Sequence, residues 1–316
     1  MPDADRRFAN YAWIVLAYTF AVIVFGAWVR ITGSGAGCGQ HWPTCHGEVV
    51  HLPETIETTI ELTHRVTSGL SLLMAIGLLI WGLARYPRPH LVRWGVVLAM
   101  VFMLLEALIG AGLVLLELVG RNDSISRAIV MAIHLSNTCL LTGAMTVAAW
   151  AAPGRQALRW RGNASLLLVG ALIGIVLVSM SGAVTALGDT LYPVSPLDGE
   201  LPLAERMARE STSAHFLQRM RVVHPLMAVG VGLYLLWLAI ALPLQPQAER
   251  LRKLGNACAG LVVAQLCAGV VNIMLSAPGW MQLVHLALAT AVWIAFVLLL
   301  LESSASGVNE AGSATA

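Results

Sequence analysis

The sequence predicts an all-α polytopic membrane protein whose eight transmembrane helices form two pseudo-symmetric four-helix bundles. Hydrophobic residues make up 58% of the 316 residues and charged residues only 11%, whereas a soluble domain carries roughly 25% charged residues. Apolar runs recur along the whole chain, and each is long enough to cross roughly 30 Å of hydrocarbon as a helix. The few charges lie in the connections, and no basic stripe or nucleic-acid-binding motif is present.

The apolar runs define the expected spans. They cover residues 12–31, 62–84, 93–118, 127–151, 163–187, 216–242, 254–276 and 281–301. A short polar segment with Arg6 and Arg7 precedes the first run, and no small-residue cleavage site follows it. We therefore expect a retained helix rather than a signal peptide. The C-terminal residues 303–316 are rich in Ser, Gly and Ala, and we expect a disordered tail.

Positive charge marks one side of the predicted bundle. The connections after the second, fourth and sixth runs are short and basic. Together with Arg6 and Arg7 they hold 11 of the 19 Lys and Arg residues, so the positive-inside rule makes this side cytoplasmic. We expect a multi-pass protein of the cell membrane with both termini in the cytoplasm. The long loops 32–61 and 188–215 then lie outside.

An internal repeat divides the chain into halves, which we expect at residues 1–155 and 156–302. The first run ends with Gly26-Ala-Trp-Val and the fifth with Gly182-Ala-Val-Thr. Glu106-x-x-x-Gly110 in the third run matches Gln265-x-x-x-Gly269 in the seventh. Because each half has an even number of helices, the repeat is parallel, with its axis near the membrane normal.

Each helix that runs inward carries one histidine near its outer end: His64, His134, His224 and His285. A neutral imidazole is a good axial ligand for haem iron, and two facing imidazoles can hold a haem between helices. Pairing within each half predicts two haem sites. A single histidine of this kind is as readily a hydrogen-bonded polar residue of the bundle, but four at matched depth favour ligation.

Arginines flank these histidines at the outer interface. Haem propionates need cationic partners there, and the alternative is ordinary snorkelling of the side chains to the interface. The candidates are Arg65, Arg219 and Arg221. His215 is a second candidate for the outer mouth, and the histidines expected at the surface are His41, His46, His51 and His90.

Glu61 precedes His64 by three residues, so both side chains share one helix face. It is suited to donate or accept a proton or to stabilise charge, while the alternative is a carboxylate favoured by the helix N-terminus. Glu106 lies deep in the third run, where we expect it only to pack against a polar neighbour.

Two cysteines, Cys38 and Cys45, lie in the first outer loop. Their spacing allows a disulfide, a dithiol redox pair or a covalent attachment point. The absence of a C-x-x-C-H sequence argues against covalent c-type haem. The other three cysteines fall inside apolar runs and are expected in the core: Cys139, Cys258 and Cys267.

One long segment has a specific resemblance. Val29-Arg-Ile-Thr-Gly-Ser-Gly-Ala-Gly-Cys38-Gly-Gln-His-Trp-Pro-Thr-Cys45-His-Gly, followed by Glu61-x-x-His64-Arg65, resembles the haem A synthase family. The similarity extends over nearly the whole chain, including the two halves and the four histidines.

The resemblance implies oxidation of the C8 methyl group of haem O to a formyl group through hydroxylated intermediates, for cytochrome oxidase biogenesis. It implies a resident haem b, with its iron, on His224 and His285. His64 and His134 would bound the substrate haem O, with Glu61 as the acidic residue beside it. Haem O synthase and oxidase assembly factors are implied partners.

The resemblance also implies a disulfide between Cys38 and Cys45, with a further role in electron or haem transfer. Some members of the family carry a second cysteine pair in the loop after the fifth helix, but residues 188–215 contain no cysteine. A mechanism that requires a second pair therefore does not apply.

Three other functions fit part of the pattern. A di-haem b-type electron-transfer protein explains the histidines but not Glu61 or the cysteine loop. A non-enzymatic haem carrier or assembly factor is the second alternative. A quinone oxidoreductase that uses the loop dithiol is the third, and it leaves the histidines without a role.

Overall fold

The computed structural model describes residues 3–154, 158–159, 162–195, 200–213, 215–242 and 249–305. Eight helices in this part of the chain are long and apolar enough to cross a membrane, which confirms the predicted fold class. They are α1 (Asp3–Ile31), α2 (Ile56–Arg85), α3 (Leu91–Leu115), α4 (Ile125–Ala151), α5 (Asn163–Leu191), α8 (Phe216–Ala241), α9 (Glu249–Met274) and α10 (Gly279–Ala305).

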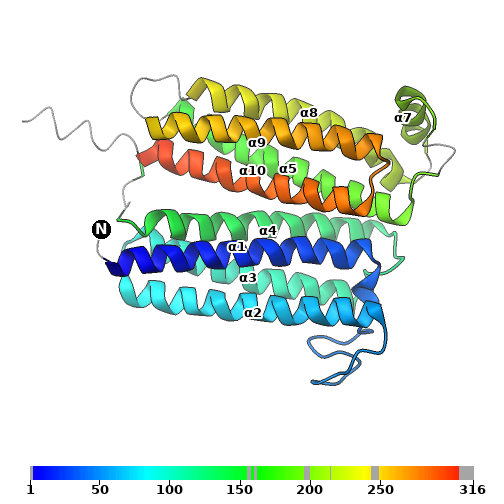
Figure 1. The fold of residues 1–316 in the computed structure, drawn as a ribbon, viewed down its shortest axis with the longest axis horizontal. Coiled ribbons are helices and arrows are strands. Elements are labelled where there is room, and N and C mark those ends of the chain that lie inside the picture. The colour runs from blue at the N-terminus through cyan, green and yellow to red at the C-terminus, as the bar shows by residue number, and fades with distance from the viewer. Residues whose placement is uncertain are drawn as a thin grey trace, which may run out of the picture.

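The helices pack as two groups of four, one beside the other (Figure 1). In the N-terminal group α1, α2, α3 and α4 form a closed ring of neighbours, and in the C-terminal group α5, α8, α9 and α10 do the same. The groups meet along a seam where α4 contacts α5 and α10, and α1 contacts α10. This packing is consistent with the predicted pair of four-helix bundles.

Most helices begin before the predicted apolar run, because polar residues complete their first turns. The side-chain oxygen of Thr55 accepts a hydrogen bond from the Thr58 amide, so α2 begins at Ile56 rather than at 62. Glu61 is therefore a helical residue and not the end of a loop. Ser124 caps α4 in the same way, through the amide of Arg127.

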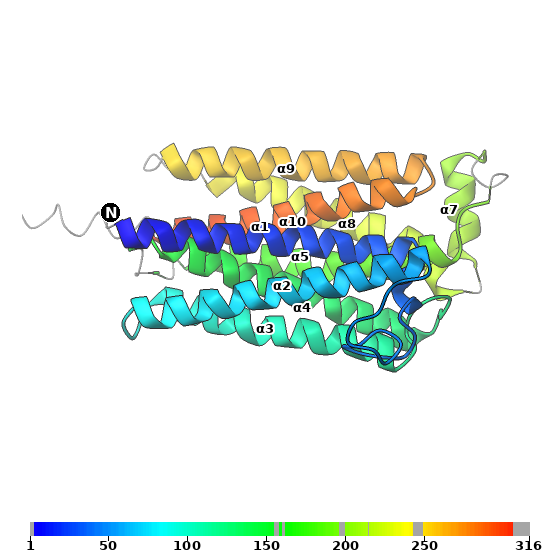
Figure 2. The ribbon, with the colours of Figure 1, turned by 60° about the horizontal axis from the view of Figure 1, so that its bottom comes forward.

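Both long connections lie at the same end of the bundle, as predicted (Figures 1 and 2). The first contains a 3-10 turn, η1 (Ser34–Ala36), and the second contains a short amphipathic helix, α7 (Leu203–Ser211). Arg206 of α7 donates to the carbonyl of Ile273 and to Ser276, at the end of α9. The second loop is therefore a partly helical cover, held to the C-terminal bundle.

The opposite end carries the N-terminus and the basic connections (Figure 1). There Arg85 pairs with Asp5 at 3.1 Å. The expected boundary between the halves, at residues 155 and 156, lies outside the described residues, as do Arg155 and Arg161. The helix α10 continues to Ala305, so the first three residues of the expected tail are helical, and residues 306–316 again lie outside the description.

Candidate functional site

The four candidate ligands occupy corresponding places in α2, α4, α8 and α10. Each histidine follows the first residue of its helix by six to nine positions. All four helices begin at the end of the bundle that carries the long loops (Figure 1). The structure therefore brings His64, His134, His224 and His285 to a similar depth, two in each bundle.

In the C-terminal bundle the rings of His224 and His285 are neighbours, with centroids 6.5 Å apart and nearly perpendicular planes, at 88°. An imidazole nitrogen binds a metal ion at about 2 Å and the ring centre lies about 1 Å beyond, so two imidazoles on one ion have centres about 6 Å apart. The observed separation fits a single iron held between both rings.

Polar neighbours orient both rings of this pair. The Ser181 hydroxyl lies 2.9 Å from Nδ1 of His224, which leaves Nε2 of that ring for a metal. Gln265 on α9 places Nε2 3.2 Å from Nε2 of His285. Among the described residues, Nδ1 of His285 and Oε1 of Gln265 are buried without a hydrogen-bond partner. Buried polar atoms of this kind indicate a site built for a further polar or metallic group.

The N-terminal bundle has a related but charged arrangement. His134 and Glu106 approach to 3.1 Å, between Nδ1 and Oε1, and Thr138 donates to the same carboxylate oxygen at 2.6 Å. His64 packs edge-to-face on Phe25 with ring centroids 5.5 Å apart. Nδ1 of His64 is also buried without a partner in the described chain.

Two glycines of the internal repeat explain how the helices come this close to the histidines. A Cβ added at Gly26 would lie 3.1 Å from Cε1 of His64, and one added at Gly182 would lie 3.0 Å from Cε1 of His224. Both distances are shorter than ordinary van der Waals contact. The repeated glycine therefore makes room for an imidazole in each half.

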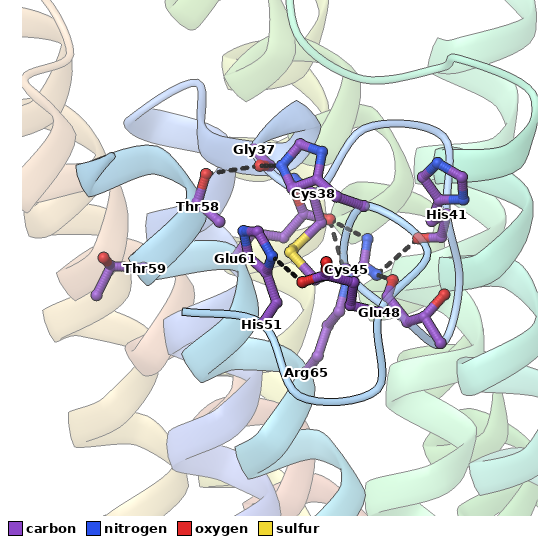
Figure 3. Close-up of a disulfide and its surroundings, with 12 residues drawn as sticks. Gly37, Cys38, His41, Cys45, Glu48, His51, Thr58, Thr59, Glu61 and Arg65 are labelled. Atoms are coloured by element: carbon purple, nitrogen blue, oxygen red, sulfur yellow. Dashed lines mark hydrogen bonds and ion pairs between the residues drawn. A yellow bond between two sulfur atoms is a disulfide. The ribbon is translucent and has the colours of Figure 1, made fainter. Parts of the chain in front are cut away.

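Glu61 and Arg65 hold the first outer loop, as Figure 3 shows. The Cys38 amide donates to Oε2 of Glu61 at 2.8 Å, and Arg65 bonds to Oε1 of the same carboxylate. Arg65 also donates to the carbonyls of His41 and Thr44. Glu61 is 4% exposed, so this carboxylate and guanidinium form a buried clamp on the loop.

The loop itself is closed by a disulfide between Cys38 and Cys45 (Figure 3). Among the alternatives for this cysteine pair, the bridge is the form present in the structure. Both residues are buried, because the loop lies directly against the first turns of α2, where Thr58 donates to the Gly37 carbonyl at 2.7 Å.

The expected propionate partners differ in their surroundings. Arg65 is occupied by Glu61 and the loop, and Arg221 pairs with Asp189 at 2.7 Å and with Glu210 at 3.3 Å. Arg219 is exposed. Arg219 is therefore available to a haem propionate, whereas Arg65 and Arg221 are already bound by carboxylates.

Two expectations about burial were wrong. His90 is 2% exposed rather than at the surface, because it caps α3 through the Val92 amide and packs on Tyr86, with ring centroids 4.6 Å apart. Cys267 is exposed on α9, unlike the buried Cys139 and Cys258, because an apolar helix residue can face lipid as readily as the core.

Three further predicted surface histidines lie in the first loop, where His41 and His46 are exposed and His51 is partly buried. His215 caps α8 through the Leu217 amide, and its Nε2 is 3.4 Å from Asp123. It therefore lies at the end of the bundle that carries the long loops, where Asp123 is its partner.

Sequence reasoning missed Arg30, at the end of α1. It donates to the Ala186 carbonyl at 2.6 Å, to Thr190 on α5, and to Gln282 on α10 at 2.9 Å. One side chain thus joins the two bundles at the seam. Its only sequence signal was a charged residue within the last turn of an apolar run.

Comparisons with known proteins identify several relatives of this chain. A Thermus thermophilus protein named Protoheme IX farnesyltransferase is 46% identical over 299 residues, which cover 94% of this chain but 48% of that relative. A Heme A synthase from Exiguobacterium sibiricum is 29% identical over 183 residues, 57% of this chain and 59% of the relative. One from Geobacillus kaustophilus is 38% identical over 125 residues, 39% of this chain and 37% of the relative.

The chain spans about half the length of the Thermus thermophilus relatives that it matches. The family model described as "Cytochrome oxidase assembly protein" (COX15-CtaA) matches residues 9–297. Because this match covers nearly the whole chain, the protein belongs to the COX15-CtaA family of cytochrome oxidase assembly proteins.

Proposed function

We propose that this protein is a haem A synthase, an oxidoreductase that converts the C8 methyl group of haem O to a formyl group. The carrying observation is the neighbouring rings of His224 and His285, with centroids 6.5 Å apart, together with His64 and His134 at corresponding positions of the other bundle. Family membership and the Heme A synthase relatives support the same reaction.

The two bundles take different roles in this proposal. His224 and His285 would hold a resident haem b, which would supply one-electron redox chemistry when bound. His64 and His134 bound the site of the substrate, haem O. The substrate carries a long apolar farnesyl tail, and a site between membrane helices avoids the cost of hydrating that tail.

Conversion of a methyl to a formyl group is a four-electron oxidation of the carbon. With water as the oxygen source the balance is R–CH₃ + H₂O → R–CHO + 4 H⁺ + 4 e⁻, so an external electron acceptor must take up the electrons. Two successive hydroxylations give a geminal diol, which loses water. Proton movements in an apolar bundle need ionisable carriers. Glu106 contacts His134 directly and is placed to exchange a proton at Nδ1 of that ring. Glu61 is bound by the Cys38 amide and by Arg65, so its role in this proposal is to hold the cysteine loop on the first turns of α2.

A haem farnesyltransferase is the second candidate, because the Thermus thermophilus relative carries that name. Transfer from a prenyl diphosphate needs Mg²⁺, which carboxylates and the phosphates hold together. The sequence has five aspartates, at positions 3, 5, 123, 189 and 198, and no two are three or four residues apart. The closely spaced carboxylates are instead Glu54, Glu57 and Glu61, of which Glu61 is bound by Cys38 and Arg65. In the described chain Asp189 is paired with Arg221. These observations favour oxidation over prenyl transfer.

The deciding experiment expresses the chain in cells that make haem O but no haem A, and identifies the extracted haems by mass. We expect haem A and hydroxylated haem O, lost in His64→Ala and His134→Ala but retained in the control His41→Ala. Haem A formation by His64→Ala at the wild-type rate would contradict the site.

The same experiment separates the alternatives. Haem B alone would favour a di-haem cytochrome. Haem A bound only when another enzyme supplies it would indicate a carrier. Haem O formed from haem B and farnesyl diphosphate by the purified chain would indicate the transferase.

We propose the cell membrane as its location, with both termini in the cytoplasm. Support comes from the basic residues at the end of the bundle that carries the N-terminus, such as Arg85 and Arg93. Haem O synthase and oxidase assembly factors are the proposed partners. Reporter fusions after Ala316 that are active only outside the cytoplasm would overturn this orientation.

A further inference from the structure

The first outer loop gathers metal-binding side chains outside the haem sites. The sulfur of Cys45 and one ring nitrogen each of His46 and His51 all lie within 4.8 Å of one another. The two histidine rings have centroids 4.9 Å apart. His46 is exposed and His51 is partly buried, so a solvated ion can reach this group.

Local hydrogen bonds hold the group together. The amide of His46 donates to the Cys38 carbonyl at 3.1 Å, and Cys45 and Glu48 exchange two backbone hydrogen bonds. The carboxylate of Glu48 lies 2.9 Å from Nδ1 of His51. The positions of the two histidines are therefore fixed by the same short turn that carries Cys45.

In the oxidised protein the sulfur of Cys45 is bonded to Cys38 and cannot act as a thiolate ligand. Reduction of the bridge takes two electrons and two protons from a dithiol, which is itself oxidised to a disulfide, and it leaves two thiols. Metal binding by the Cys45 thiol then releases one proton.

We propose that the reduced loop is a binding site for a borderline-soft divalent cation of the Zn²⁺ class. Cys45, His46 and His51 are its ligands, and a solvent molecule completes a tetrahedral set. Thiolate and imidazole donors in this number and geometry are those that Zn²⁺ prefers. The disulfide excludes the metal, and the bound metal keeps the cysteines from closing again.

The proposal is independent of the haem chemistry and can be tested on the full chain in detergent. The protein is treated with a phosphine reductant, exposed to Zn²⁺ in the presence of a competing chelator, desalted and analysed for zinc. We expect one zinc ion per reduced chain. The affinity of the oxidised chain for zinc should be at least tenfold lower than that of the reduced chain. Equal binding by both forms would overturn the proposal.

Variants test the ligands one by one. His46→Ala and His51→Ala should each lose the zinc, whereas His41→Ala, in the same loop, should keep it. Cys38→Ser leaves Cys45 without a bridge partner and should bind zinc with no reductant present, while Cys45→Ser should not bind under either condition. Loss of zinc in His41→Ala, or no binding by Cys38→Ser, would refute this ligand set.

A second readout guards against variants that merely misfold. Bound zinc should protect Cys45 from alkylation in the reduced wild-type chain, as measured by mass mapping of the modified peptide. The rate of Cys45 alkylation should rise at least tenfold when a chelator removes the zinc. Each variant is compared with the wild type only if both contain the same amount of haem per chain. Alkylation of Cys45 in zinc-loaded protein would contradict direct ligation of the metal by this residue.

Discussion

Glu106 on α3 and His134 on α4 are joined at 3.1 Å, between Oε1 and Nδ1, whereas the matching pair in the other half, Gln265 and His285, joins a neutral amide to an imidazole. A carboxylate against a ligating histidine fixes the ring and raises its basicity. The two halves therefore differ by one charge at corresponding positions of the repeat.

Glu106→Gln should make the N-terminal site resemble the C-terminal site, where a neutral amide lies beside the histidine. Loss of the carboxylate should weaken haem O binding or turnover by about 10–100-fold, and it should raise the midpoint potential of haem bound in that half, because a negative charge is removed. Redox titration and turnover of haem O measure both effects. Gln265→Glu should lower the potential in the other half, and an unchanged potential in both variants would contradict the assignment.

Gly182→Ala should displace the imidazole of His224, because the added Cβ would lie 3.0 Å from Cε1 of that ring. We expect a clear loss of haem per chain, measured from the absorbance of the extracted haem. Gly230→Ala on α8 is the matched control, since a Cβ there meets nothing within 4 Å. Full haem content in Gly182→Ala would show that the close contact is relieved without cost to the site.

Arg30→Gln should destabilise the seam between the bundles. Hydrogen bonds to a charged group contribute about 1.5–3 kcal/mol each, and the guanidinium bonds to three partners on α5 and α10. We expect a decrease of about 3 kcal/mol in the free energy of unfolding, measured by denaturation in detergent.

The control for Arg30 is Lys253→Ala, in an exposed pair with Glu249 at 2.6 Å. A surface pair of this kind contributes less than about 1 kcal/mol. An Arg30→Gln protein as stable as the control would show that the seam does not depend on this side chain.

His90→Asn should reduce the pH dependence of stability. Burial lowers the pKa of His90 below its usual value, although the charge of Asp5 acts in the opposite direction. Because the folded-state pKa is lowered, the stabilising contribution of neutral His90 is fully present above its unfolded pKa of about 6.5. Its contribution is lost as the pH falls from there toward the folded-state value.

Asparagine can cap α3 in place of His90 without titrating in this range. Unfolding of wild type and variant should therefore be compared between pH 7.5 and 5, where the decrease in stability is expected to be smaller for His90→Asn. Parallel curves would show that other titrating groups account for the pH dependence.

The sequence was sufficient to predict the number of spans, because length and apolarity alone determine a membrane helix. It also predicted that both long loops lie at one end of the bundle, because an even number of spans separates them. It did not define where helices begin. The first turns of α2 contain Glu57 and Glu61 and read as loop, and only the Thr55 cap identifies them as helical.

At the candidate site, helix spacing placed the four histidines at one depth, and the repeat identified Gly26 and Gly182. The spacing could not reveal that Arg65 binds the cysteine loop instead of facing the site. Contacts between distant segments leave no periodic signal, and the same is true of Arg30, whose partners follow it by 156 residues or more.

The link from Arg30 to Gln282, 252 residues later in the chain, has a consequence for biogenesis. At a synthesis rate of about 5–20 residues per second, roughly 10 to 50 seconds separate the two residues at the ribosome. For about the first 8 to 30 seconds of that interval, before Ala186 and Thr190 of α5 follow, the guanidinium has none of these three partners. The contact of Arg30 with α10 therefore forms after its contact with α5, and the seam is not complete until Gln282 has been inserted.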